Sequence, residues 1–482
     1  MPDKPNVLLI CADHWGGMLT RPGGHPVVMT PTLSQLARLG TWYANTYSPA
    51  PSCIPARRSL MTGLSVRTHG DRIFKEREEL PDVPTLAQTF RNAGYQASAV
   101  GKLHAYPQRD RIGFDEVILN EEGRHHLEGN ADDWEMYLAD KGYAGKEYAA
   151  GHSSSDYNVT PWHLPDEAHP TNWTTREMCR TIRRRDPRKP AFWYMSHIAP
   201  HPPMWPLQSY LDLYRDVEID PPAMGEWTKD PDTVPWMLKA YNDGGGAMKG
   251  APAHEIKEAR RAFYALITHI DHQLRVVIGA LREEGILDNT IIALTADHGD
   301  MLGDHGRWAK TLMFDMSAKV PLVIVPPKGD ARITPGEVDN RLVETMDIMP
   351  TLLELAGVPV PDTVEGTSLL TDESRDHIYG EHWEGDFANR MVRDSRYKLI
   401  YYPVGNSFQL FDMQEDRREE HDLSESADHA TIRGRLTDLL IDHLYGVDLE
   451  WLQDGKLVGV PLKPLPQYQD RGLGAQRGIR YM

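Results

Sequence analysis

The stretch from Pro51 to Gly63 places a cysteine ahead of a proline and an arginine. Cys53 is one of only three cysteines in the chain. Pro55 suits the first turn of a helix, because the N–H that proline lacks would have no acceptor there. Cys53 would then face the free N–H groups at the positive helix end, where anions are stabilised and the pKa of a thiol is lowered. The alternative is a structural cysteine that is buried in a turn.

Other residues with catalytic or ligand chemistry directly follow short apolar runs. They are Asp13 and His14, Lys102 and His104, His201, and Asp297 and His298. Continuous apolar runs of this length predict strands that are buried on both faces. The carboxyl ends of parallel strands lie along one edge of a sheet, and ligands bind beyond that edge. We therefore expect a single site that is assembled from distant parts of the chain.

Helical patterns alternate with these strands, which predicts an α/β fold with a large, mostly parallel sheet and helices on both faces. The predicted strands are residues 7–12, 96–100, 191–195, 290–296 and 320–325. The predicted helices are residues 32–39, 84–93, 172–185, 254–284 and 346–356.

The pattern changes near residue 376. Short antiparallel strands are predicted at 391–393, 398–402 and 409–411, with a helix at 431–444. We predict an N-terminal catalytic α/β domain of residues 1–375, with irregular insertions at about 120–190 and 205–252. A C-terminal α+β subdomain of residues 376–482 would follow, with a small antiparallel sheet, a helix and an extended tail.

Composition narrows the class of protein. The 482 residues carry a formal net charge of −18, which argues against binding to nucleic acid or to an anionic membrane. No stretch approaches the length of a membrane span, and the apolar run at 7–12 is too short for the core of a signal peptide. Three cysteines provide no disulfide framework, so we expect a cytoplasmic protein.

Asp13, Asp297 and His298 are candidate ligands of one divalent cation, because carboxylates with an imidazole suit Ca²⁺, Mg²⁺ or Mn²⁺. His14 is a further ligand or lies behind the ligands. The alternative for Asp297 and His298 is a turn with a capping carboxylate. Three cations beside this site would form a clamp for a tetrahedral oxyanion, unless they are ordinary surface side chains. They are Arg57, Lys102 and Lys310.

The stretch Cys53-Ile54-Pro55-Ala56-Arg57, with Thr62-Gly63 downstream, resembles the sulfatase signature Cys-x-Pro-x-Arg. A maturation enzyme recognises that signature when it oxidises the cysteine to formylglycine. The similarity continues at Gly101–His104, Pro200–Pro202, Thr295–Asp300, Lys310, Asp347–Leu352, Arg396–Lys398 and Leu410–Asp412. The chain is identified as a member of the formylglycine-dependent sulfatases, in the arylsulfatase and phosphonate monoester hydrolase branch of the alkaline phosphatase superfamily.

The resemblance implies metal-dependent hydrolysis of sulfate esters through a covalent sulfo-enzyme. Cys53, as the hydrated formylglycine, would bind the metal and attack sulfur, while Arg57 and Lys102 stabilise the anion. Lys310 and His201 would serve the leaving group, and His104 would help the second hydroxyl to expel sulfate. The implied metal ligands are Asp13, Asp297, His298 and the modified Cys53, with His14 as a further candidate. Ca²⁺ is the expected metal, with Mn²⁺ or Mg²⁺ as alternatives.

His14 departs from the family pattern, because many sulfatases have a second Asp there and some phosphonate hydrolases have Gln. A neutral residue at this position leaves Mn²⁺ open as the metal and lowers the negative charge that a phosphorus diester would meet. The first alternative is therefore a phosphonate monoester or phosphodiester hydrolase that uses the same site. A second alternative is a non-catalytic, anion-binding relative.

The expected partners are a small-molecule ester as the substrate and a formylglycine-generating enzyme during maturation. The Pro-rich and Gly-rich tail after Val458 resembles an arm more than a core element, which suggests contact with another subunit. We therefore expect a homo-oligomer, either a dimer or a tetramer.

Overall fold

The structure is a computed structural model that describes residues 4–122, 131–152, 155–241, 248 and 250–466. Parts of both predicted insertions, and the predicted tail from residue 467 onward, lie outside the described residues.

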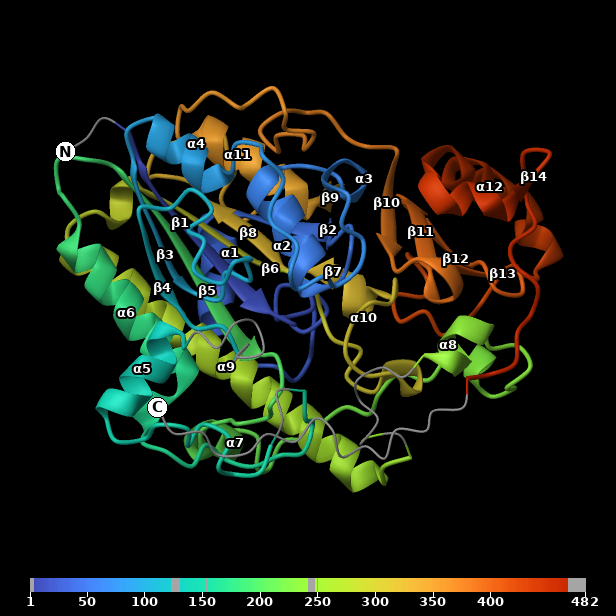
Figure 1. Cartoon of the computed structure of the whole chain (residues 1–482), viewed down its shortest axis with the longest axis horizontal. Coiled ribbons are helices and arrows are strands. Elements are labelled where there is room, and N and C mark those ends of the chain that lie inside the picture. The colour runs from blue at the N-terminus through green and yellow to red at the C-terminus, as the bar shows by residue number, and fades with distance from the viewer. Residues whose placement is uncertain (1–3, 123–130, 153–154, 242–247, 249, 467–482) are drawn as a thin grey trace.

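A large mixed sheet forms the centre of the chain (Figure 1). Its strands are β1 (Asn6–Asp13), β2 (Thr41–Tyr47), β3 (Gln96–Gly101), β4 (Glu116–Leu119), β5 (Ala191–Pro200), β6 (Thr290–Ala296), β7 (Lys319–Val320), β8 (Leu322–Val325) and β9 (Val338–Glu344). Their order is β4-β3-β5-β1-β6-β8-β2-β7, and β9 pairs with β2. The five strands from β4 to β6 are parallel to one another. The prediction of a mostly parallel sheet is confirmed, with β7 and β8 as antiparallel strands.

Helices cover both faces of this sheet, as predicted. The helices are α1 (Pro31–Leu39), α2 (Cys53–Thr62), α3 (Val66–His69), α4 (Leu86–Asn92), α5 (Asp133–Asp140), α6 (Pro170–Arg184), α7 (Gln208–Asp212), α8 (Trp236–Ala240), α9 (Ala253–Glu283), α10 (Asp315–Ala318) and α11 (Ile348–Leu355). Alternate residues of β1 belong to two cores. Leu8 and Ile10 pack in the core that contains α1, α6 and α9, whereas Val7 and Leu9 pack in the core that contains α2, α4 and α11.

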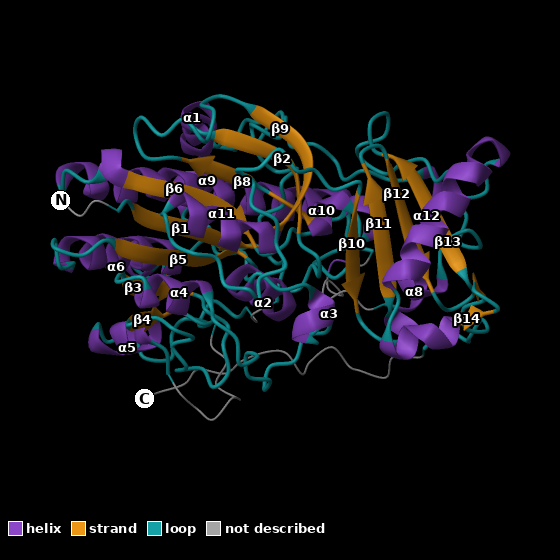
Figure 2. Ribbon diagram, turned by 90° about the horizontal axis from the view of Figure 1, so that it is seen from above, coloured by secondary structure: helices purple, strands orange, loops and turns teal. Residues whose placement is uncertain are grey.

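A second, antiparallel sheet follows in the C-terminal part, as predicted. It contains β10 (His377–His382), β11 (Asn389–Asp394), β12 (Tyr397–Tyr402) and β13 (Ser407–Asp412). Helix α12 (Ala430–His443) packs Leu436 and Leu440 on it, and the short strands β14 (Leu452–Gln453) and β15 (Lys456–Leu457) follow. Figure 2 shows this sheet beside the large one. The domain boundary at residue 375 stays a prediction.

Some strands differ from the predicted ones for physical reasons. β4 has only four residues and is half exposed. β9 has polar residues at Asp339–Arg341 and is buried only over its last three positions, so neither strand has a continuous apolar run. β2 is buried but has the polar sequence Thr-Trp-Tyr-Ala-Asn-Thr-Tyr. β5 continues to Pro200, five residues beyond the predicted end. In the part of the chain that the structure describes, no helix is long and apolar enough to cross a membrane.

Candidate active site

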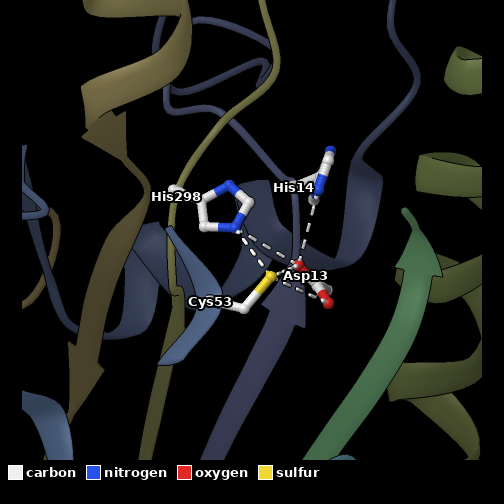
Figure 3. A group of neighbouring side chains, drawn as sticks. All are labelled: Asp13, His14, Cys53 and His298. Atoms are coloured by element: carbon white, nitrogen blue, oxygen red, sulfur yellow. Dashed lines mark hydrogen bonds and ion pairs between the residues drawn. The ribbon is translucent and has the colours of Figure 1, made fainter. Parts of the chain in front are cut away.

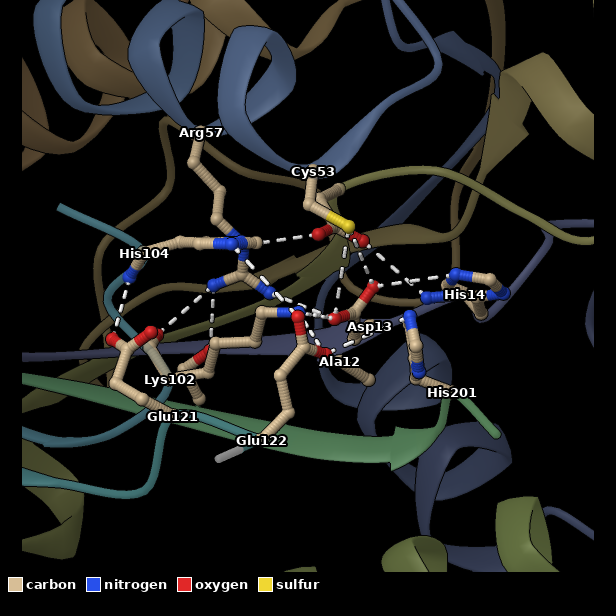
Figure 4. Close-up of polar contacts among 12 residues, drawn as sticks. Ala12, Asp13, His14, Cys53, Arg57, Lys102, His104, Glu121, Glu122 and His201 are labelled. Atoms are coloured by element: carbon tan, nitrogen blue, oxygen red, sulfur yellow. Dashed lines mark hydrogen bonds and ion pairs between the residues drawn. The ribbon is translucent and has the colours of Figure 1, made fainter. Parts of the chain in front are cut away.

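Four neighbouring strands direct their carboxyl ends to one place. The strands β3, β5, β1 and β6 end at Gly101, Pro200, Asp13 and Ala296. Lys102, His201 and Asp297 follow three of these ends directly, and the N-terminus of α2 brings Cys53 to the same point. The structure thus brings the predicted residues together at one sheet edge (Figure 4).

Cys53 is the first residue of α2, and its side chain lies beside Asp13 and His298 (Figure 3). Its side chain is buried, and its Sγ accepts a hydrogen bond of 2.9 Å from Lys310 Nζ. Sγ also lies 3.2 Å from His298 Nε2 and 3.6 Å from Asp13 Oδ1. Gly63 ends the helix in the left-handed conformation, with φ of 67°, which glycine adopts without strain. The glycine of the Thr-Gly pair therefore ends the helix that presents Cys53.

The pKa of the Cys53 thiol is about 12, so the expected lowering at a helix N-terminus is wrong for this cysteine. Burial raises the pKa most, and the charge of Asp13 raises it further. Lys102 and Lys310 act in the opposite direction but do not compensate. Cys53 is therefore a neutral thiol near pH 7, and a neutral thiol is a weak nucleophile.

Two buried carboxylates, those of Asp13 and Asp297, have different positive neighbours and opposite pKa shifts. Asp13 forms an ion pair with Lys102, and although burial opposes ionisation, the charge of Lys102 holds the pKa of Asp13 well below its usual range. Asp297 accepts a hydrogen bond of 2.9 Å from Arg57 Nε. Burial and the charge of Asp13 nevertheless raise the pKa of Asp297 to about 7. Without a further cation, the site cannot keep both carboxylates fully ionised.

Two imidazoles have their Nε2 atoms directed into the group. His298 Nδ1 lies 2.8 Å from the carbonyl of Gly299, which can only accept, so Nδ1 carries the proton and Nε2 is free to bind a cation. His14 Nδ1 lies 2.8 Å from Asp300 Oδ2, and its Nε2 accepts a hydrogen bond of 2.7 Å from Lys310. Burial lowers the pKa of both histidines.

These groups have the donor types of a metal site. Single ligand atoms of Asp13, His14, Cys53 and His298 all lie within 4.8 Å of one another. Asp297 lies at the edge of the group, with Oδ1 3.7 Å from His298 Nε2 and its other oxygen on Arg57. The sequence did not decide whether His14 is a metal ligand, and its position in this group makes it a candidate ligand.

The three predicted cations have different surroundings. Lys102 is fully buried and contacts Asp13 and Glu122. Lys310 is partly buried and contacts Cys53 and His14. Arg57 is largely occupied, because its Nη1 donates to the carbonyl of Lys102, to Tyr194 Oη and to Ser196 Oγ at 2.8–3.1 Å. Only its Nη2, 3.9 Å from Asp13, has no hydrogen-bond partner among the described residues. Arg57 thus pairs with Asp297 and keeps one amino group, Nη2, without a hydrogen-bond partner among the described residues.

His201 and His104 lie around one carboxylate that the sequence analysis missed, that of Glu122. His201 Nδ1 donates to the carbonyl of Pro202 at 2.6 Å, and its Nε2 lies 3.6 Å from Glu122 Oε2. Burial lowers the pKa of His201 to about 4, so near pH 7 this imidazole is a neutral acceptor. His104 Nε2 lies 3.8 Å from Glu122 Oε1, and its backbone N–H donates to Glu121 at 2.6 Å.

The missed residues had a weak signal in the sequence. Glu121 and Glu122 come just after β4, so the rule that ligands gather at strand ends would have identified them if that four-residue strand had been recognised. Asp300 follows Asp297 and His298 within one short stretch, but only its contact with His14 shows its part in the site. Tyr157, whose hydroxyl donates to Asp300, lies in a predicted insertion and had no signal.

Comparisons with known proteins identify the family of the chain. The sulfatase family model matches residues 5–358, and the model of the N-sulphoglucosamine sulphohydrolase C-terminal region matches residues 303–444. An arylsulfatase of Clostridium perfringens is 34% identical over 480 residues, which cover 96% of this chain and 99% of the relative. A multifunctional alkaline phosphatase superfamily protein of Trinickia caryophylli is 26% identical, over 89% of this chain and 93% of the relative.

Among solved structures, the phosphonate monoester hydrolase of Agrobacterium radiobacter has the same fold. The TM-score is 0.76 at 24% identity, with 95% of this chain and 99% of the other chain covered. The chain belongs to the sulfatase family. It is a sulfuric ester hydrolase.

Substitution of Glu122 by Gln should strengthen the binding of sulfate, the product anion. The Glu122 carboxylate lies beside Lys102 and His201 and repels an anion held there. We expect the inhibition constant of inorganic sulfate, measured at fixed ionic strength against hydrolysis of 4-nitrophenyl sulfate, to fall roughly threefold to tenfold. Glu116→Gln, at an exposed position on β4, removes the same charge and should leave the constant unchanged. If sulfate inhibits Glu122→Gln as weakly as the wild type, or more weakly, the Glu122 carboxylate does not repel the bound anion.

Proposed function

We propose that this sulfatase hydrolyses the sulfate esters of small molecules with a formylglycine that a maturation enzyme makes from Cys53, and with one divalent metal ion. The observation that carries the proposal is the position of Cys53 Sγ, which contacts Lys310 and His298 and lies beside Asp13. A neutral thiol at this position would be a weak nucleophile. Formylglycine in its hydrated form supplies one hydroxyl that attacks and a second that releases the bound group.

The residues at the strand ends suit a divalent cation. Asp13, Asp297 and the two imidazoles of His14 and His298 provide oxygen and nitrogen ligands, and the raised pKa of Asp297 indicates a shortage of positive charge. When bound, such a cation supplies the charge that activates a hydroxyl and neutralises ester oxygens. Ca²⁺ is the metal that the family resemblance implies, and Mg²⁺ is an alternative. Among these three ions, the pair of imidazoles favours Mn²⁺ over Ca²⁺ and Mg²⁺.

The side chains around Cys53 then have separate tasks. Lys102 and the free Nη2 of Arg57 hold the non-bridging oxygens of the ester. Lys310, which already donates a hydrogen bond to position 53, donates to the leaving oxygen. His201 presents a neutral Nε2 and orients the ester, and it must take up a proton before it can serve as an acid. His104 assists the release of sulfate beside Glu122.

A second candidate function, hydrolysis of phosphonate monoesters or phosphodiesters, is supported by His14. A neutral imidazole stands where many sulfatases place a second carboxylate, and it lies 3.8 Å from Asp13. Lower negative charge at this point favours phosphorus esters, which the same clamp would hold as tetrahedral anions. We propose this reaction as a side activity of the same site.

The wider biological setting consists of predictions. We propose a formylglycine-generating enzyme as the partner during maturation, a homo-oligomeric assembly of two or four chains, and a cytoplasmic location.

The state of Cys53 in protein from the native host tests the proposed function. We expect peptide mass spectrometry to show an aldehyde that lacks the sulfur atom at position 53. Cys179, which is also buried, should remain unmodified and serves as the control within the same chain. Fully active protein with an unmodified thiol at position 53 would rule out the formylglycine mechanism.

A His14→Asp substitution tests the metal site and the second candidate function together. A carboxylate in place of the imidazole makes the ligand set harder and more negative. Titration of the metal-free protein, followed by calorimetry, should show a shift in relative affinity from Mn²⁺ towards Ca²⁺ of about tenfold. The ratio of phosphodiester to sulfate ester hydrolysis should fall in the same variant. His197→Asn, at a buried histidine outside the site, is the control. Unchanged metal preference in His14→Asp would exclude His14 as a ligand.

A further inference from the structure

A cavity of about 510 Å³ lies between the large sheet and the C-terminal sheet, away from the catalytic group. Asn45 of β2, Lys319 of β7 and Val338 of β9 line one side, and Arg393 of β11 lines the other. None of its lining residues belongs to the group around Cys53. Its volume falls in the range of small-molecule binding sites.

The lining of this cavity has a surplus of positive charge, although the chain as a whole carries −18. Among the described residues that line it, Lys319, Arg393 and Arg417 are the cations and Asp315 is the one carboxylate. Asp315 is already engaged, because its Oδ1 accepts hydrogen bonds from Lys398 Nζ at 2.7 Å and from Tyr47 Oη at 2.8 Å. The lining therefore lacks the negative charge that would balance its cations.

Arg393 shows this imbalance most clearly. Its side chain is only 4% exposed and forms no ion pair with the described residues. Nη2 donates to Asn45 Oδ1 at 3.3 Å, the guanidinium lies 4.8 Å from the ring centre of Tyr47, and neither Nε nor Nη1 has a hydrogen-bond partner among the described residues. Burial lowers the pKa of Arg393 to about 10. A buried guanidinium with two unused donors is costly unless an acceptor occupies the cavity.

Lys319 lies beside the same acceptor. Its Nζ donates to Asn45 Oδ1 at 3.3 Å, so one neutral amide oxygen serves both Lys319 and Arg393. The nearest carboxylate oxygen, of Asp315, is 3.7 Å away. Burial lowers the pKa of Lys319; Asp315 and Glu419 oppose this shift, whereas Lys398 and Arg417 add to it. Two cations that share a neutral acceptor repel each other, and an anion between them would remove that repulsion.

We propose that this cavity binds a doubly charged tetrahedral oxyanion, carried as a phosphate monoester by a small organic molecule. The guanidinium of Arg393 lines the cavity together with Lys319 and the exposed Arg417, and these three cations supply the positive charge that would hold the anion. Trp42 and Met413 provide an apolar wall for the organic part. Free inorganic sulfate, the product of the reaction, presents the same anion chemistry without the organic part.

Isothermal titration of the wild-type, metal-loaded protein with phenyl phosphate and, separately, with inorganic sulfate tests the proposal. The active site accounts for one anion per chain, and we expect a second. Arg393→Gln should weaken the second binding event by about tenfold or more and leave the inhibition constant of phosphate against sulfate ester hydrolysis unchanged. Arg188→Gln removes the same charge from an exposed loop and should retain both binding events.

The same titrations identify the source of the anion and keep the proposal open to refutation. If phenyl phosphate binds the second site more tightly than inorganic sulfate does, the ligand is a phosphate monoester with an organic part. Equal or weaker binding of phenyl phosphate contradicts the claim that the ligand has an organic part. In anion-free buffer, Arg393→Gln should unfold at the same temperature as the wild type or higher, because an unpaired buried charge is removed. If Arg393→Gln does not fold, the same titration is carried out on Arg417→Gln, which changes an exposed residue of the cavity. Loss of the second anion-binding event in this variant supports the proposal, and retention contradicts it. The proposal is overturned if the wild type shows a single binding event. It is also overturned if the second event is as strong in Arg393→Gln and in Arg417→Gln as in the wild type.

Discussion

Three carboxylates, of Asp13, Asp297 and Glu122, meet three cations at the carboxyl ends of the central strands, and the balance of their charges governs the site. Asp13 takes the nearest positive charge, from Lys102, and Asp297 is left with Arg57 and a raised pKa. Burial of charges costs free energy unless each is paired and hydrogen-bonded. The backbone N–H groups of His14 and His298, which both donate to Asp297, supply part of that pairing.

Burial also explains the protonation state of each titratable group in the site. Burial keeps the Cys53 thiol neutral. It also keeps the imidazoles of His14, His201 and His298 neutral, so these side chains present lone pairs to the centre of the site. Each of these imidazoles has its Nδ1 beside an oxygen acceptor, which fixes the direction of its Nε2. A cation and an oxyanion would therefore enter a site whose donors and acceptors are already oriented, and little reorganisation is needed.

The residues that could be predicted were those at the ends of apolar strands. Val7 to Ala12 identified β1 with Asp13 at its end, whereas the pairing of β1 with β6, which brings Asp13 beside Asp297, is seen only in the structure. Glu122 could not be predicted, because the four residues of β4 lack an apolar run. The neutral state of Cys53 could not be predicted either, since it depends on burial that several separate segments create. The contact between Asn45 and Arg393 joins residues that are 348 positions apart, and no local pattern announces it.

The most direct test of the formylglycine mechanism is single-turnover labelling of a Cys53→Ser variant. A serine at this position has one hydroxyl for attack but no second hydroxyl to expel the bound group. With 4-nitrophenyl sulfate, the variant should release about one equivalent of nitrophenol and then stop, with sulfate retained on the introduced serine in the peptide mass. Sustained turnover at the wild-type rate, or a burst that leaves the introduced serine without sulfate, would contradict the mechanism.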